Sequence, residues 1–186
     1  MLIKYSIPLE QGTISHSVTL IPRLEYSINL LNGIIEILEE KCSELKESNK
    51  SLAWDFDESN KIHLNAIRLE QIMICSLDVL LHIKQRTGRI CGIHDIPEVL
   101  PASIPMIRTV SAQLFDIDPL CSQKLSELSV HMGSIVLDSA VLTKARFDFS
   151  LSNEESATTL DEVKLMADSK LSKQYPNLDF LKLCNN

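Results

Sequence analysis

Glycine and aromatic residues are scarce in this chain of 186 residues, which has only 5 Gly and 5 % aromatics. A β-sandwich or barrel needs glycine at many tight turns, so this scarcity argues against a turn-rich all-β fold. Leucine and isoleucine are abundant instead, and aliphatic side chains of this kind interlock along seams between helices. The composition therefore predicts an all-α protein, and the length suits one ordinary or one elongated domain.

Positive charge is also in short supply, because 18 Lys and Arg face 25 Asp and Glu, for a net charge of −7. This balance speaks against nucleic-acid binding, and against a grip on anionic lipid by the whole surface. No uninterrupted apolar run reaches the roughly 18 residues of a membrane span, and the first twenty residues lack the layout of a secretory signal. We therefore expect a soluble, cytoplasmic protein.

Signatures of catalysis and metal binding are missing as well. The five cysteines are scattered and never spaced as C-x-x-C. Cys91 and His94 form one short-spaced pair, whereas a zinc site needs about four converging ligands. The sequence has no glycine-rich phosphate loop, no G-x-S-x-G and no H-E-x-x-H. We predict reduced thiols packed as small hydrophobic residues, with no enzyme activity, no metal and no cofactor.

Two long apolar seams dominate the first half of the sequence, each with steps that alternate between four and three residues. The first seam is Leu24, Ile28, Leu31, Ile35, Leu38, Cys42, Leu45, Leu52 and Phe56, and Asn49 is its one polar interruption. The second seam is Ile62, Ala66, Leu69, Met73, Ser76, Leu80, Ile83, Thr87 and Ile90. This rhythm predicts two long helices. The polar stretch 57–61 separates them as a turn, which makes a long antiparallel helical hairpin.

Three shorter helices are predicted on or near the hairpin. A glycine and three prolines end its second helix, and the apolar repeat then predicts a short helix that ends near Leu114. The next helix has Asp118 as its N-cap and Pro119 in its first turn. Ser152 and Glu155 form a capping-box pattern at the start of a fifth helix. The chain is thus divided into an N-terminal arm (1–20), a helical core (21–145), a flexible loop (146–153) and the fifth helix with its tail (154–186).

The N-terminal arm follows a different period. Its apolar side chains alternate at Ile3, Tyr5, Ile7 and Leu9, and after a turn-like Gln11-Gly12 they resume at Ile14, Val18 and Leu20. A period of two predicts a short β-hairpin. A lone two-stranded ribbon is marginally stable in water, so it would need a surface to lie on. The alternative is a disordered arm that orders on a membrane or a partner.

Three stretches of the sequence carry a family resemblance. They are the start of the first long helix (22–33, PRLEYSINLLNG), the proline-containing run after the second (97–110, PEVLPASIPMIRTV), and the last helix with its proline stop (160–171 and 175–178). In their order and spacing these stretches resemble the ESCRT-III family, and most closely the archaeal CdvB-type cell-division proteins of thaumarchaea. The resemblance covers about residues 22–178.

The resemblance implies a structural protein without an active site, which polymerises with itself and with paralogous subunits into filaments on membranes. Such filaments constrict the membrane neck during archaeal cell division, at the inner face of the cell membrane, and a AAA ATPase remodels them by pulling on C-terminal motifs. The resemblance also implies that the first four helices form the polymerising core and that the fifth can fold back on the hairpin. We therefore expect an autoinhibitory or polymer seam on the fifth helix, formed by Leu160, Val163, Ala167 and Leu171.

Acidic charge separates this sequence from the basic first helix that is common in the family. Residues 1–96 carry ten Lys and Arg against thirteen Asp and Glu, for a net charge of −3. Lys84, Arg86 and Arg89 form one local basic cluster, the candidate lipid-facing patch. The alternative is a solvated helix end whose cations complement the helix dipole.

The end of the sequence holds a candidate docking motif for an ATPase or another partner, formed by Leu178, Phe180, Leu181 and Leu183. A frayed or packed terminus is the alternative. The acidic balance keeps a second function open. In that alternative the chain is a soluble coiled-coil adaptor or regulator of such a polymer, with no direct contact to lipid.

Overall fold

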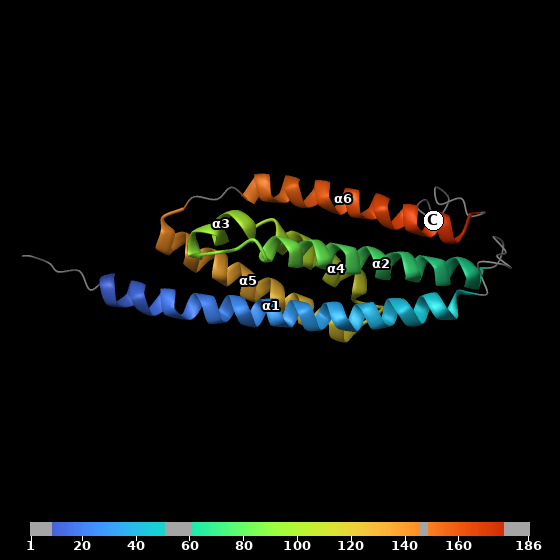
Figure 1. Ribbon diagram of the computed structural model, residues 1–186, viewed down its shortest axis with the longest axis horizontal. Coiled ribbons are helices and arrows are strands. Elements are labelled where there is room, and N and C mark those ends of the chain that lie inside the picture. Colours follow the sequence, from blue (N-terminus) through green and yellow to red (C-terminus); the bar gives the residue numbers. More distant parts are fainter. Residues whose placement is uncertain (1–8, 51–60, 146–148, 177–186) are drawn as a thin grey trace, which may run out of the picture.

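The computed structural model describes the backbone of residues 9–50, 61–145 and 149–176, and the side chains of these ranges except at 9–18, 149 and 150. These residues form an elongated bundle of helices that lie along one common axis (Figure 1). No strand occurs among the described residues. The all-α prediction is therefore confirmed for them.

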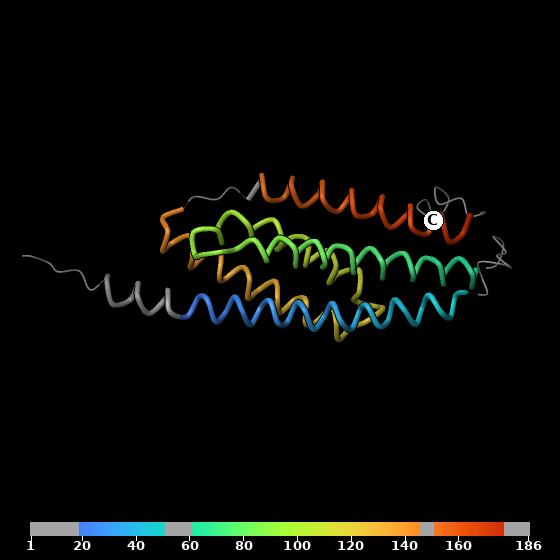
Figure 2. Tube along the Cα trace, viewed as in Figure 1, coloured from blue at the N-terminus to red at the C-terminus, as the bar shows by residue number. Residues whose placement is uncertain are grey.

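The two longest helices are α1 (Leu9–Ser48) and α2 (Lys61–Thr87). At 1.5 Å per residue they are about 60 Å and about 40 Å long. They pack against each other and run in opposite directions (Figure 2). Their aliphatic seams face the interior, where Leu31 and Leu38 of α1 and Leu80 and Ile83 of α2 are fully buried.

The beginning of α1 differs from the sequence prediction. Residues from Leu9 to Leu20 are helical where the end of the first strand, the turn and the second strand of a hairpin were expected. Pro22 lies inside the helix rather than in its first turn. The rest of the expected first strand, at Ile3, Tyr5 and Ile7, lies outside the described residues. Over so short a stretch the two-residue period of a strand cannot be distinguished from the period of a helix. The apolar residues at 14, 18 and 21 also keep the four-three spacing of a helix. Pro22 has no N–H, so the carbonyl four residues earlier lacks its helical partner.

Short elements connect the long pair to the rest of the bundle. A 3-10 turn, η2 (Ile93–Asp95), leads into α3 (Ile96–Val99), which is followed by α4 (Ser103–Leu114) and α5 (Pro119–Thr143). The Asp118 carboxylate caps α5 as predicted, because it accepts a hydrogen bond of 3.1 Å from the backbone N–H of Cys121. Its other oxygen accepts one of 2.5 Å from Lys41 Nζ on α1.

These contacts change the acidity of Asp118. Burial alone would raise the pKa of the carboxyl, but the hydrogen bonds from Lys41 and Cys121 outweigh it and lower that pKa to about 2. Asp118 therefore caps α5 and, through its ion pair with Lys41, joins the start of α5 to the C-terminal part of α1.

α5 packs against both α1 and α4. It is also long and apolar enough, by length and composition, to cross a membrane, with an 18-residue window of mean hydropathy 1.2. Of that window 39 % is buried inside the protein. Length and composition do not distinguish such a segment from the core helix of a water-soluble protein.

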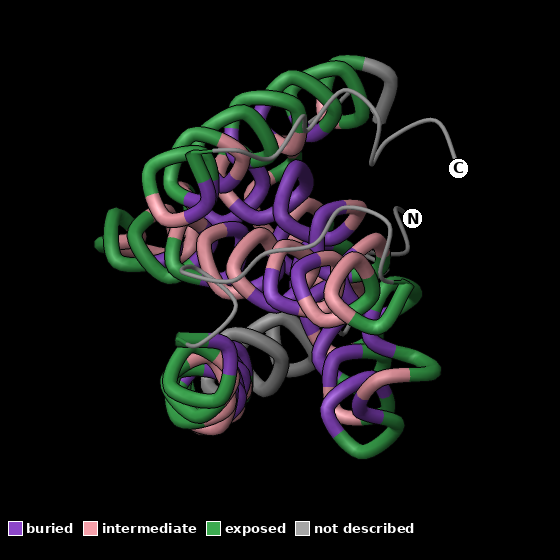
Figure 3. The backbone as a smooth tube through the Cα atoms, turned by 90° about the vertical axis from the view of Figure 1, so that its right-hand side faces the viewer, coloured by how far each residue is buried: buried purple, intermediate pink, exposed green. Residues whose placement is uncertain are grey.

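The last helix, α6 (Phe149–Gln174), begins inside the segment 146–153 that was predicted as a loop. Asn153, the last residue of the predicted loop, is an exposed residue of this helix. Ser152 is therefore a residue of the first turn and not an N-cap. α6 packs along α2 and α4, on the side of α2 that faces away from α1 (Figure 1). The view along the bundle shows exposed residues over the outer side of this helix (Figure 3).

Candidate functional site

The inner face of α6 carries the four seam residues that the sequence singled out. Val163, Ala167 and Leu171 are at most 2 % exposed, and Leu160 is half-buried against the same core. Their spacing of three, four and four residues places them in one row along the helix. The structure thus brings all four together at the boundary between α6 and the pair α2 and α4.

α2 can hold this row because its apolar face is wider than one seam. Besides the residues that face α1, Ile67 is buried, and Ile72 and Leu77 are half-buried against the core. α2 therefore packs against α1, α4 and α6 at once. Without α6, part of this wide face would be exposed to water.

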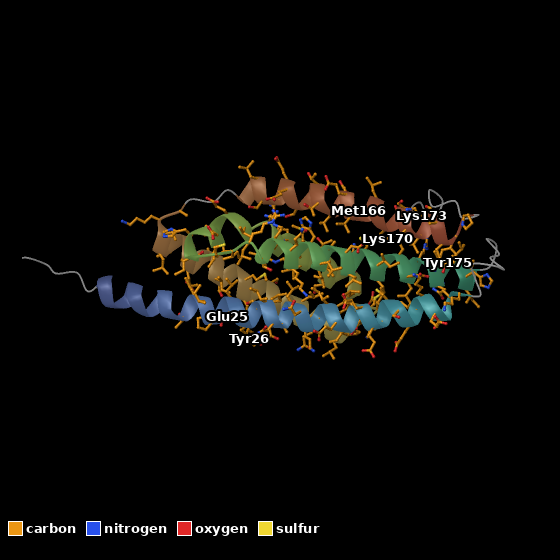
Figure 4. All side chains as sticks on the ribbon, viewed as in Figure 1. Glu25, Tyr26, Met166, Lys170, Lys173 and Tyr175 are labelled. Carbon is orange, nitrogen blue, oxygen red and sulfur yellow. The ribbon has the colours of Figure 1, made fainter. Side chains whose placement is uncertain are left out.

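Polar contacts flank the seam along the length of α6. Near its start, Ser156 donates a 2.7 Å hydrogen bond to the carbonyl of Ala102, and Glu155 forms an ion pair with Arg86 of α2. Further along, Lys170 Nζ lies 2.7 Å from a carboxylate oxygen of Asp78 (Figure 4). Lys170 is more than half exposed, and such ion pairs are worth little in water, about 0–1 kcal/mol. These contacts orient α6 on the bundle but contribute little to the free energy that keeps it docked.

A buried carboxylate joins the end of α6 to the rest of the bundle. Glu70, in the middle of α2, is 1 % exposed. Its oxygens accept hydrogen bonds from Tyr175 Oη at 2.8 Å, from Gln174 Nε2 at 3.0 Å and from Asn49 Nδ2 at 2.9 Å. We call these four residues the Glu70 clasp.

The clasp connects three parts of the chain, namely the end of α1, the middle of α2 and the end of α6. Its three donors are neutral side chains, and a buried carboxylate depends on such donors because it has lost its water. Burial, followed by the hydrogen bond to Glu70, raises the pKa of Tyr175 above its ordinary range. Tyr175 therefore stays a neutral donor at physiological pH.

The sequence prediction missed the clasp, although two signals were visible. Asn49 is the one polar residue in the register of the first seam, and Glu70 directly follows an apolar seam position in α2. A polar residue at an otherwise apolar helix position indicates either an exposed edge or a buried partner. The sequence alone did not show that these two residues and Tyr175 meet.

α6 covers one of the three cations in the candidate lipid-facing patch and leaves the other two exposed. Lys84 and Arg89 are exposed, but the Arg86 side chain is only 13 % exposed, because it pairs with Glu155 and donates a hydrogen bond to the Val99 carbonyl. Burial, together with the charges of Arg86 and Arg89, lowers the pKa of the nearby His82. With α6 in place, two of the three cations remain on the surface.

The candidate docking motif at Leu178, Phe180, Leu181 and Leu183 lies outside the described residues.

A crevice with a cavity of about 280 Å³ lies between α2, α4 and α6, where Cys75 and Ala167 are among its lining residues. Burial raises the pKa of Cys75 and raises that of Cys42 and Cys121 to about 11. The raised pKa favours the neutral thiol at each of these three positions.

Within the part of the chain that the structure describes, no three His, Cys, Asp or Glu residues gather into a group that could hold a metal ion. No protein-family model matches the chain, and no solved structure matches it. The docked helix α6, with its seam and the Glu70 clasp, is the candidate functional site.

Proposed function

We propose that this chain is an ESCRT-III-like structural subunit that assembles with itself and with paralogous subunits into filaments, and that these filaments remodel membrane during archaeal cell division. In this proposal α1 and α2 correspond to the long hairpin of the family. The chain works in the cytoplasm, at the inner face of the cell membrane, and a AAA ATPase acts on its C-terminal residues. The observation that carries the proposal is the docking of α6 over the wide apolar face of α2.

The docked helix has the properties of a removable cover. Its inner row contains one valine, one alanine and one leucine that are fully buried, and its polar contacts near Glu155 and Lys170 are partly exposed to water. A fully buried Val or Leu side chain contributes about 1.5–3 kcal/mol. Release of α6 would therefore cost less than unfolding the bundle, and it would expose an apolar face that a neighbouring subunit can bind.

A second candidate function rests on the surface charge. Arg86 is engaged by Glu155, and the chain as a whole carries a net charge of −7. Both observations favour an acidic adaptor or regulator of such a polymer that does not bind lipid itself. In this case α6 would be released by a partner subunit rather than at a membrane.

Two substitutions in the full-length chain test the release of α6. Val163→Asp places a charge in the buried row and should detach the helix. Leu165→Asp places the same charge two residues away, on the exposed side of the same helix. We expect Val163→Asp to give faster amide exchange in α6, together with sedimenting assemblies and filaments in electron micrographs. Leu165→Asp should behave like the unmodified chain. If α6 exchanges rapidly in Val163→Asp but the protein stays monomeric, the proposal is wrong.

Liposome co-sedimentation separates the two candidates. The Val163→Asp variant is mixed with anionic vesicles at low and at physiological salt. Binding that weakens as salt rises indicates direct electrostatic contact with lipid. A further change of Lys84 and Arg89 to Gln should then abolish it. Assembly without vesicle binding at either salt concentration supports the adaptor.

A further inference from the structure

The crevice between α2, α4 and α6 combines an apolar interior with polar groups at its mouth. Ile72 and Cys75 of α2 line it and are half-buried, and Ala167 of α6 is fully buried. Lys164 of α6 and Gln113 of α4 also line it, and both are exposed. An apolar cavity with a few converging polar groups is the usual form of a site for a small ligand.

The charge of the crevice is opposite to that of the whole chain. Arg68 and Lys164 line it, and no Asp or Glu is found among the described lining residues, although the chain carries a net charge of −7. Asp168 lies one turn after Lys164 on α6, but its carboxylate already accepts a 2.5 Å hydrogen bond from Gln71 Nε2. Lys164 has no hydrogen bond or ion pair with another described residue. The crevice therefore favours an anionic group.

The size and the lining of the crevice restrict the rest of the ligand. A cavity of about 280 Å³ is at the small end of ligand sites, which commonly measure about 300–1,000 Å³. No aromatic ring occurs among the described lining residues, so a nucleobase would find no side chain to stack on. The aliphatic surfaces of Ile72 and Ala167 suit a short alkyl chain instead.

We propose that this crevice binds a small amphipathic anion, an aliphatic carboxylate whose alkyl chain lies against Ile72, Cys75 and Ala167. Its carboxylate contacts Lys164 and Arg68 at the mouth of the crevice. A charge-assisted contact of this kind is stronger than one between neutral groups.

The site is complete only while α6 is docked, because its lining comes from α2, α4 and α6. A ligand that binds the docked form alone stabilises that form by mass action. The binding site goes beyond the proposed function. Its regulatory consequence rests on that function, since a bound anion that keeps α6 docked would oppose assembly.

Four probes separate the contributions of charge and chain in the full-length protein. Octanoate carries both features, 1-octanol has only the chain, acetate has only the charge, and octylammonium has the opposite charge. Isothermal titration calorimetry below the micellar concentration measures the affinity of each probe. We expect octanoate to bind about ten-fold more tightly than any of the other three, because it alone satisfies both parts of the site.

Two lysine substitutions on α6 test the position of the anionic group. Lys164→Gln removes the exposed cation at the crevice and should weaken octanoate binding about five-fold or more. Lys173→Gln removes another exposed lysine of the same helix, which is not among the lining residues, and should leave the affinity unchanged. Both side chains are exposed, so neither change disturbs the core. Circular dichroism checks that both variants fold.

Amide exchange connects the binding to the docking of α6. At a concentration ten times its dissociation constant, octanoate should slow exchange in α6 about ten-fold. At the same concentration, a five-fold weaker affinity in Lys164→Gln reduces this slowing to about three-fold. Lys173→Gln should behave like the unmodified chain.

Equal affinities for octanoate and 1-octanol would overturn the proposal, as would equal affinities of Lys164→Gln and Lys173→Gln for octanoate. Octanoate binding that does not slow exchange in α6 would place the ligand elsewhere and would also overturn it. Slower exchange with anionic vesicles but not with free octanoate would assign the cations to a membrane surface, again against the proposal. None of these measurements depends on assembly, which the Val163→Asp experiment tests separately.

Discussion

α5 and α6 have nearly the same length, 25 and 26 residues, but they are held in different ways. α5 has six fully buried apolar side chains, which are Cys121, Leu125, Leu128, Met132, Ile135 and Val136. α6 has three, and one of them is an alanine. α5 lies between α1 and α4, whereas α6 covers one side of the bundle. The interior of this protein is therefore divided into a part that unfolds only as a whole and a cover that can open on its own.

The largest effect on stability is expected from a cavity in the core beside α5. Leu128→Ala removes a fully buried side chain and should cost about 2–5 kcal/mol of global stability. Thermal or urea unfolding followed by circular dichroism measures this loss. A decrease below 1 kcal/mol would mean that the core around α5 can rearrange, and that it is not the rigid part of the molecule.

The matched change in α6 should act locally. Leu171→Ala removes an equally buried leucine and should weaken the docking of α6 by about 2–3 kcal/mol. Amide exchange in α6 should accelerate about 30- to 150-fold, while exchange in α4 and α5 stays unchanged. If exchange accelerates equally in all helices, α6 is not a separate unit.

Acid should loosen the attachment of α5 to α1. The lowered pKa of Asp118 favours its charged form in the folded protein, so its contribution is complete above the ordinary pKa near 3.8 and is lost as pH falls through about 2. The shift of the Asp118 pKa from 3.8 to about 2 corresponds to about 2 kcal/mol of folding stability. The Asp118 carboxylate is only 7 % exposed, so water screens it little.

The Asp118→Asn variant provides the control for this pH effect. It keeps a capping side chain but does not titrate. Unfolding curves give the free energy of unfolding of both proteins at pH 5 and at pH 2. The difference between the two proteins should be about 2 kcal/mol smaller at pH 2 than at pH 5. A constant difference between them would show that Asp118 does not titrate with folding.

The smallest effect is expected at the rim of α6. Lys170→Ala removes the ion pair with Asp78, and Lys170 is 57 % exposed. We expect a loss below 1 kcal/mol, which decreases further in high salt. Amide exchange of α6 at two salt concentrations measures it. A loss as large as that of Leu171→Ala would mean that ion pairs and not the seam hold the cover.

The sequence predicted the parts of this structure that depend on local periodicity. The buried row of α6 and the cap at Asp118 were predicted from apolar spacing and from one Asp-Pro pair. The starts of α1 and α6 were not. Alternating apolar residues before Pro22 and polar residues around Ser152 are compatible with more than one local structure, and tertiary packing decides between them.

The Glu70 clasp could not be predicted for a different reason. Asn49, Glu70 and Tyr175 are separated by up to 126 positions in the sequence, and each is unremarkable in its own segment. Their meeting depends on how far α1 and α6 are shifted along α2. Periodicity predicts which face of a helix is buried, but it does not fix the position of one helix along another.

The clasp fixes the position of α6 along α2. Aliphatic seams with a seven-residue repeat are nearly unchanged when one helix slides along its neighbour by a full repeat, a step of about 10 Å. Such a slip would leave the apolar contacts of α6 largely intact but would separate Glu70 from Tyr175 and Gln174. An abandoned buried carboxylate costs several kcal/mol. The clasp therefore selects one alignment among several that hydrophobic packing alone would accept, and it does so at the single buried carboxylate of α2.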